Sequence, residues 1–264
     1  MKIYFPQWQG AGNKSVLNGA KALLNTLDEQ NFYKIPLSEK DSTPSSKVNY
    51  HGSLVDQLSK FRSVLEEKKP ETLQILGGDC GLEIIPVSYL NHKYAPHFAA
   101  IWFDAHADSN LPHESPSHNF HGMPLRTLTG EGPEAMIPLL FSKLLPSQIF
   151  YVGLRETDPQ EKVFIKKHKL FTTRQTDPFA LVNALRANQI KHIYIHFDTD
   201  VLDPSAYAHT FYQVPGGLHI HEAITYIKTL KEHFNTVGSS LLESVASHKS
   251  QLHTIDPIIK MLFA

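Results

Sequence analysis

Acidic side chains and an imidazole recur at alternate positions in two short runs, Asp104-Ala105-His106-Ala107-Asp108 and Asp198-Thr199-Asp200. In an extended chain alternate residues share one face, so the two runs could converge on one point. Carboxylates and imidazole bind Mn, Fe, Zn or Mg, and five such ligands exceed the needs of one ion. Either run alone could be a turn whose carboxylates cap backbone amides, so the prediction depends on the pair. Together they predict a binuclear metal hydrolase in which two ions activate a bridging water or hydroxide.

The composition of the 264-residue chain excludes several classes of protein. The formal net charge is −1, and the chain has no block of like charges. It therefore lacks the basic segment expected of a protein that binds nucleic acid or an anionic membrane. A single cysteine excludes an internal disulfide framework. Met1–Phe5 lacks the pattern of a signal peptide, and no run approaches the ~18 apolar residues of a membrane span. We therefore expect one cytoplasmic domain over residues 1–264 that acts on a small molecule.

Short apolar runs alternate with amphipathic segments, which is typical of α/β proteins. The expected strands are Lys2–Phe5, Phe32–Ile35, Leu73–Leu76, Ala99–Asp104, Ile149–Gly153, Ile193–Asp198 and Val237–Glu243. The expected helices are Ser15–Leu27, Gly52–Lys68, Gly81–Leu90, Gln160–Lys167, Pro178–Asn188, Ile220–Phe234 and Leu252–Phe263. Because several central strands are apolar on both faces, we expect a three-layer α/β/α sandwich around a mainly parallel sheet. Both acidic runs then fall at the carboxyl ends of strands, where such sheets bind ligands.

Further motifs extend the pattern between Leu73 and Glu243. In chain order the set is Gly77-Gly78-Asp79-Cys80, Asp104–Asp108, His121-Gly122-Met123-Pro124-Leu125, Asp198–Pro204 and Glu243. In these motifs the chain resembles the family of arginases, agmatinases and related ureohydrolases, and arginases above all. The resemblance implies an arginase-like fold, a guanidino substrate and a homo-oligomer, either a trimer or a hexamer.

The resemblance also implies a role for each residue of the two acidic runs. Asp104 and Asp198 match the carboxylates that bridge two divalent ions. Asp108 matches a ligand of the first ion, whereas His106 and Asp200 match ligands of the second. The family favours Mn²⁺ at these sites.

Cys80 stands at the remaining ligand position of the first ion, where arginases usually have a histidine. A thiolate is softer than imidazole and would shift the preference from Mn²⁺ towards Zn²⁺ or Fe²⁺. Three outcomes are open: Cys80 binds the first ion, that ion binds with fewer protein ligands, or only one ion binds. Cys80 could also be a buried thiol with an apolar role.

Two residues match the parts of the family site that handle protons and substrate. His121 matches a histidine that carries protons between the site and solvent, and an ordinary imidazole pKa of about 6.5 suits that task. Glu243 matches the glutamate that pairs with the substrate guanidinium, a planar cation that a carboxylate binds through two parallel hydrogen bonds. The resemblance further implies that Asp108 receives a proton from the nucleophile and passes it to the leaving amine.

Five residues bear on the choice of substrate. Asn110, Ser117 and Asn119 have the spacing of the arginase residues that bind an α-carboxylate, and Asp158 matches one that contacts the α-amino group, with Glu161 nearby. The alternative is structural, because Asn and Ser form turns and Asp158 precedes a proline as a helix cap would. The resemblance favours hydrolysis of L-arginine to L-ornithine and urea, by attack of a metal-bridging hydroxide on the guanidinium carbon.

Three departures from the family pattern keep other functions open. Tyr212 stands where arginases often have a small hydroxyl residue, and His196 replaces a typically small residue. Ser240 does not follow the usual sequence of the family. The alternatives are an agmatinase, another guanidino- or amidino-compound hydrolase, or a degenerate member with altered metal occupancy and a binding or regulatory role.

Overall fold

Residues 1–40, 44–174 and 177–263 are described by a computed structural model. Within these residues, eight strands form one sheet in which all neighbours are parallel. The strands are β1 (Lys2–Phe5), β2 (Phe32–Lys34), β3 (Leu73–Gly77), β4 (Phe98–Phe103), β5 (Ile149–Val152), β6 (Phe171–Thr173), β7 (His192–Phe197) and β8 (Asn235–Leu241). Their order across the sheet is β2-β1-β3-β8-β7-β4-β5-β6. The sheet is therefore centred on β3, β8, β7 and β4.

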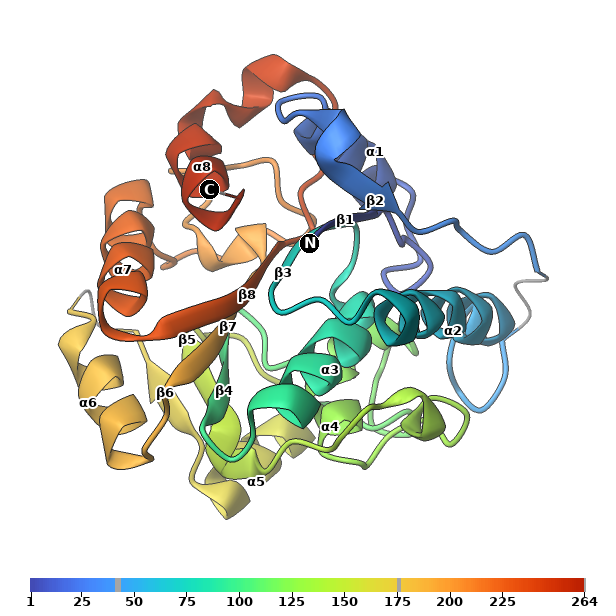
Figure 1. The fold of residues 1–264 in the computed structure, drawn as a ribbon, viewed down its shortest axis with the longest axis horizontal. Coiled ribbons are helices and arrows are strands. Elements are labelled where there is room, and N and C mark those ends of the chain that lie inside the picture. The colour runs from blue at the N-terminus through green and yellow to red at the C-terminus, as the bar shows by residue number, and fades with distance from the viewer. Residues whose placement is uncertain (41–43, 175–176, 264) are drawn as a thin grey trace.

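Helices cover both faces of this sheet (Figure 1). They are α1 (Ser15–Leu24), α2 (His51–Lys68), α3 (Ile84–Tyr94), α4 (Pro124–Leu128), α5 (Pro159–His168), α6 (Phe179–Ala187), α7 (Ile220–His233) and α8 (Asp256–Phe263). One core cluster joins the sheet to α2, α3, α4 and α5, and the other joins it to α1, α6, α7 and α8. The predicted three-layer α/β/α architecture is thus confirmed.

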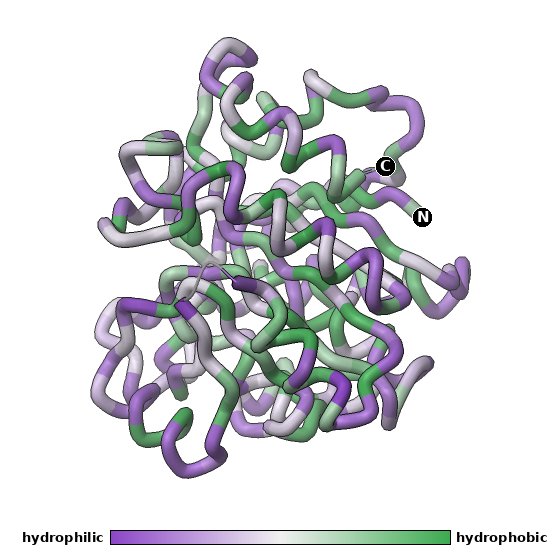
Figure 2. The backbone as a smooth tube through the Cα atoms, turned by 90° about the vertical axis from the view of Figure 1, so that its left-hand side faces the viewer, coloured by the Kyte–Doolittle hydropathy of each residue, from purple (hydrophilic) through white to green (hydrophobic). Residues whose placement is uncertain are grey.

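The two core clusters exist because the central strands are apolar on both faces. Every residue of β4 is buried, and so is every residue of β7 except His192 at its start. Hydrophilic segments lie mainly at the outer turns of the backbone tube (Figure 2). No helix in the described residues combines the length and apolar character needed to cross a membrane.

The structure corrects several predicted boundaries. Three predicted strands, Ala99–Asp104, Ile193–Asp198 and Val237–Glu243, end before their acidic residues, which lie in the following loops. The predicted helix Leu252–Phe263 is divided into a 3-10 helix, Lys249–Ile255, and α8, which has Pro257 in its first turn.

The sequence prediction missed β6 and α4. Strand β6 has only three residues and lies at the sheet edge with one side exposed, so its apolar pattern is weak. Helix α4 has five residues, too few to show a helical repeat.

Candidate metal centre

The carboxyl ends of the four central strands meet at one place on the sheet edge. Cys80 follows β3, Glu243 follows β8, Asp198 follows β7 and Asp104 follows β4. Because these strands are parallel neighbours, the four side chains are brought together although they are distant in sequence. A cavity of about 220 Å³ opens here, and all the predicted site residues line it except Asp104, which lies buried beneath, and Asn119.

Turns, rather than extended strands, give the two acidic runs their shape. A carboxylate oxygen of Asp104 accepts from the backbone N–H of His106 at 2.6 Å, and Asp198 accepts from that of Asp200 at 2.7 Å. Asp108 has a positive φ of 49°. The extended geometry inferred from the alternate spacing is therefore wrong, although the structure does bring residues of the two runs together, as Asp104, His106 and Asp200 show. Each bridging candidate uses one oxygen in its turn; the other oxygen of Asp104 accepts from Trp102 Nε1 at 3.1 Å, and that of Asp198 faces Cys80.

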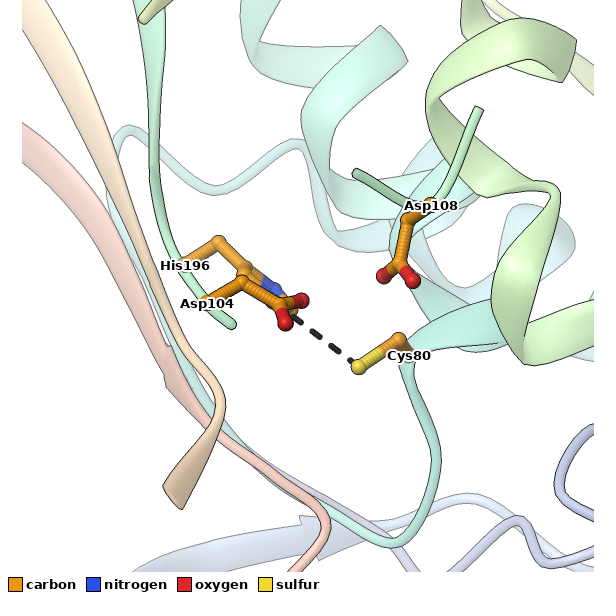
Figure 3. A group of neighbouring side chains, drawn as sticks. All are labelled: Cys80, Asp104, Asp108 and His196. Atoms are coloured by element: carbon orange, nitrogen blue, oxygen red, sulfur yellow. Dashed lines mark hydrogen bonds and ion pairs between the residues drawn. The ribbon is translucent and has the colours of Figure 1, made fainter. Parts of the chain in front are cut away.

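Two groups of metal-binding atoms share Asp104. In one, a ligand atom each from Asp104, His106 and Asp200 lies within 4.8 Å of the others, and His106 Nδ1 is 2.8 Å from Asp200 Oδ2. In the other, a ligand atom each from Asp104, Cys80, Asp108 and His196 lies within the same 4.8 Å limit (Figure 3). A carboxylate that belongs to both groups has the position expected of a bridge between two ions.

Three carboxyl groups of this centre, those of Asp108, Asp198 and Asp200, lie in surroundings that disfavour their charged form. Burial and the neighbouring carboxylates raise the pKa of Asp108 and of Asp198 well above the ordinary range, and raise that of Asp200 to about 6. Burial acts against a charged imidazole, but hydrogen bonds to Asp104 and Asp200 raise the pKa of His106 nonetheless. A bound cation would stabilise the charged form of these buried acids, and oxygen, nitrogen and sulfur donors fit divalent ions.

Cys80 is part of this centre. Its Sγ atom lies 3.3 Å from Asp198 Oδ2 and 3.8 Å from His196 Nε2, and the residue is only 2% exposed. Burial and the surrounding carboxylates raise the pKa of its thiol, so a bound cation would be needed to stabilise the thiolate. Of the possibilities that the sequence leaves open for Cys80, this position favours direct ligation.

His196 is a potential ligand that the sequence patterns did not predict. It is fully buried on β7, pairs in register with Trp102 on β4, and stacks on the indole with ring centroids 3.6 Å apart. The available signal was the alternation of Tyr194 and His196, two polar-tipped residues on one face of an otherwise apolar strand. Finding their partner, Glu83, required the fold.

Glu243 is held rigidly with one oxygen free. Its backbone N–H donates to Gly78 at 2.7 Å, and its φ is 59°. Oε1 accepts from the backbone N–H of Cys80 at 3.1 Å and is 3.0 Å from His121 Nδ1. Oε2 is buried and has no hydrogen-bond partner among the described residues. A buried anionic oxygen without a partner is costly, so this atom is suited to binding a cationic ligand.

The predicted substrate loop is divided between the cavity and the outside. Asn110 Nδ2 donates to Asp158 Oδ2 at 2.8 Å, and Asn110 Oδ1 is a second buried oxygen without a partner in the described chain. Ser117 also lines the cavity. Glu161 fastens the loop by accepting from the backbone N–H groups of Ser109 and Asp158, both at 2.9 Å, so its role here is structural.

Asn119 points elsewhere. Its carboxamide donates to the carbonyl of Ala11 at 3.0 Å and accepts from Asn49 at 2.9 Å. The structure therefore places its side chain in a link to the amino-terminal loop, outside the cavity that the other predicted substrate residues line. Spacing alone could not reveal this, because the chain turns at His118, which has a φ of 57°.

Two aromatic residues stand at the mouth of the cavity. Tyr212 is 44% exposed, and its ring centroid lies 5.5 Å from that of His106 and 5.9 Å from that of His121. Phe211 packs against Tyr212 with ring centroids 4.7 Å apart. Both rings line the cavity, so at this position Tyr212 narrows its mouth.

Comparisons with known proteins agree with the geometry of the site. A sequence profile described as the arginase family matches residues 17–259. An arginase from Staphylococcus aureus (strain COL) is 33% identical over 197 residues, which cover 71% of this chain, so the match spans only 65% of that relative's length. An arginase from Coccidioides immitis is 31% identical over 226 residues, covering 79% of this chain and 70% of the relative.

Solved structures show the same fold. The crystal structure of Entamoeba histolytica arginase in complex with L-ornithine superposes with a TM-score of 0.88 at 21% identity, covering 100% of this chain and 97% of that one. Formimidoylglutamase from Bacillus subtilis superposes with a TM-score of 0.72 at 18% identity, covering 98% and 85%. The profile, the sequence relatives and the strand-end motifs together show that this chain belongs to the arginase family.

Proposed function

We propose that the protein is a metal-dependent hydrolase of a guanidinium group, with L-arginine as substrate and L-ornithine and urea as products. The observation that carries the proposal is the unpaired, buried Oε2 of Glu243, which lines the same cavity as the metal-binding groups. A guanidinium that pairs with this oxygen is held beside those groups. An uncharged substrate would leave the negative charge at Oε2 without a cationic partner.

The residues of the two acidic runs would hold two divalent ions, with Asp104 and Asp198 shared between them. Such ions supply the acidity that turns water into a nucleophile at neutral pH. Glu243 orients the guanidinium, and Asp108, which is buried at the same centre, is placed to receive a proton and deliver it to the leaving amine.

The family relationship also supports a homo-oligomer, which light scattering of the purified protein would test.

His121 is suited to carrying protons to and from solvent. It lines the cavity, and its Nδ1 is bonded to Glu243. Burial opposes protonation, but the charge and hydrogen bond of Glu243 raise the pKa of this imidazole above its usual value. The imidazole therefore holds its proton more readily than a free histidine does, which suits a group that exchanges protons with solvent.

We expect His121→Asn to lower turnover by about 10²-fold or more, since a positioned acid or base typically contributes that much. Metal content should be unchanged, because His121 belongs to neither metal-binding group that contains Asp104. Steady-state kinetics and elemental analysis of the same preparation would test this. Loss of metal together with activity would contradict the assigned role.

Asn110 and Asp158 support an α-amino acid as substrate. Asn110 Oδ1 lacks a partner, and Asp158 supplies an anionic oxygen next to it at the cavity wall. These groups suit an ammonium, and Ser117 adds a hydroxyl donor for a carboxylate. Agmatine has a terminal amine but no α-carboxylate. Asn110 and Asp158 therefore suit either compound, and the hydroxyl of Ser117 favours arginine over agmatine.

A different guanidino or amidino compound is the second candidate. Tyr212 narrows the mouth of the cavity, and Asn119 is absent from its wall. Relatives of the fold include proteins described as a formimidoylglutamase and a proclavaminate amidino hydrolase. Urea-release and amine-release assays on arginine, agmatine and guanidino acids, each with Mn²⁺, Zn²⁺ or Fe²⁺, would separate the candidates. A fully metal-loaded protein inert towards every amidine would contradict both.

We expect Asn110→Ala to raise the KM for arginine by roughly 10- to 100-fold, the effect of losing a hydrogen bond to a charged group. A guanidino acid that lacks the α-amino group is the internal control, because it has no ammonium for Asn110 Oδ1 to accept from and its KM should change far less. Michaelis–Menten kinetics with both substrates provide the measurement. Equal effects on the two would show that Asn110 acts through the loop structure rather than by contact with the α-substituents.

A further inference from the structure

The imidazole of His196 faces the group of potential metal ligands that contains Cys80, Asp104 and Asp108. His196 reaches it from β7, and its Nε2 lies 3.8 Å from Cys80 Sγ and 3.5 Å from Asp104 Oδ2. Figure 3 shows His196 and Asp104 on one side of this group, with Cys80 and Asp108 facing them. All four residues are buried, and one ligand atom from each lies within 4.8 Å of the other three.

The other nitrogen of His196 is fixed by Glu83. Nδ1 lies 2.9 Å from Glu83 Oε1, and Glu83 is itself held by the hydroxyl of Tyr194 at 2.8 Å and by that of Ser240. A hydrogen bond to a carboxylate places the proton on Nδ1, which leaves the Nε2 lone pair for a metal. Histidines that bind metals are commonly oriented by a carboxylate in this way.

We propose that His196 is a ligand of the first ion together with Cys80, Asp104 and Asp108, and that Glu83 is its positioning residue. This inference rests on the proposed function only in requiring that the centre binds a metal ion. In a tetrahedral site with metal–sulfur and metal–nitrogen distances of about 2.3 and 2.0 Å, ligand atoms are separated by roughly 3.3–3.8 Å. The two separations measured from Nε2 fall close to this range.

The first ion therefore still has an imidazole ligand, but this ligand comes from a different strand than the family resemblance implies. Cys80 occupies the position after β3 where the family resemblance leads us to expect a histidine, and His196 supplies the ring from β7 across the same centre. A thiolate and an imidazole with two carboxylates suit Zn²⁺ better than Mn²⁺, which prefers oxygen donors and more ligands. We thus expect the first ion of this protein to be zinc.

A structural role for His196 makes a different prediction. A protonated His196 between Glu83 and Asp104 would only neutralise two buried carboxylates. In that role Nε2 keeps its proton, and no bond to a metal forms. The readout must therefore detect the nitrogen–metal bond itself as well as the binding constant.

The test measures metal binding without substrate. Zn²⁺ affinity is determined by competition with a chromophoric chelator for the wild type, for His196→Asn and for Glu83→Gln. His192→Asn is the matched control, because it makes the same change at the distant start of β7. We expect a loss of about 100-fold or more for His196→Asn and of roughly 10- to 100-fold for Glu83→Gln, and none for the control.

Direct ligation is tested with ¹¹³Cd²⁺ bound to protein containing ¹⁵N-labelled histidine. We expect cadmium couplings to two imidazoles, His106 and His196, in the wild type. His196→Asn should lose one of them, and Cys80→Ser should retain both while it loses the sulfur-dependent shift of the cadmium signal. If His196→Asn does not fold, the wild-type spectrum and Glu83→Gln still decide the matter.

Two results would overturn the inference: an unchanged zinc affinity in both variants, or a wild-type spectrum without the His196 coupling. Its failure is distinguishable from failure of the proposed function. Zinc held by His196 in a protein inert towards amidines would keep this inference and remove the function. Urea release with no His196 coupling would do the reverse.

Discussion

Asp198→Asn is expected to abolish metal binding at the shared position and to reduce turnover on the order of 10³-fold or more, while the metal-free protein becomes more stable. Two ions lose a shared ligand, and each contributes several kcal/mol of charge stabilisation to the reaction. Asparagine keeps the oxygen that accepts from the Asp200 backbone N–H, so the turn should persist. The effect on activity therefore follows from the missing charge.

The gain in stability has a simple electrostatic origin. Burial and the neighbouring carboxylates raise the pKa of Asp198, so near neutral pH the metal-free fold opposes an ionised carboxylate that the unfolded chain accommodates freely. This cost is absent well below pH 4, where the carboxyl is protonated in both states, and grows as pH rises above the unfolded pKa. Removing the acid should raise the melting temperature of the metal-free protein at pH 7 by about 2–4 °C per kcal/mol relieved.

Thermal melts in the presence of a chelator and after addition of metal, with elemental analysis, measure both effects. Asp28→Asn is the matched control, since Asp28 accepts from a backbone N–H two residues on in an exposed turn outside the site. It should change neither metal content nor metal-induced stabilisation. An Asp198→Asn protein with full activity and full metal content would contradict the assignment.

The strand-end placement of the acids could be predicted because it depends on local pattern. Runs such as β4 and β7 are apolar on both faces, which predicts buried parallel strands to within a residue or two. The site of a parallel sheet then lies at the carboxyl ends of the strands. The order β3-β8-β7-β4, which makes four of these ends neighbours, is a property of the whole chain that local patterns do not contain.

The environment of the first ion could not be predicted for the same reason. His196 faces Trp102 only through the register of β4 and β7, and it meets Glu83 only because α3 packs on that face. As isolated residues, a histidine in a strand and a glutamate before a helix have many structural explanations. Asn119 shows the converse error, since correct spacing in a loop did not place its side chain in the cavity.

Glu243→Gln should remove substrate binding while leaving the metal in place. The backbone of Glu243 is held on both sides, by the carbonyl of Gly78 and by the N–H of Phe211, so the new side chain should occupy the same position. The amide oxygen can still accept from the Cys80 backbone N–H, but the free Oε2 becomes an uncharged amide group. Breaking one partner of a buried ion pair costs about 3–5 kcal/mol. We therefore expect kcat/KM for arginine to fall by roughly 10²- to 10⁴-fold.

Binding measurements can separate charge recognition from metal binding at this residue. The wild type should prefer arginine strongly over its neutral urea analogue, citrulline, and Glu243→Gln should nearly abolish that preference in competition experiments. Glu222→Gln, the same change in the first turn of α7 and outside the site, is the control. A ligand atom of Glu243 also lies within 4.8 Å of one each from Cys80 and Asp198, so a role as metal ligand is the rival explanation. Loss of bound metal from Glu243→Gln would favour that rival, because a residue that only pairs with the guanidinium has no contact with the ions.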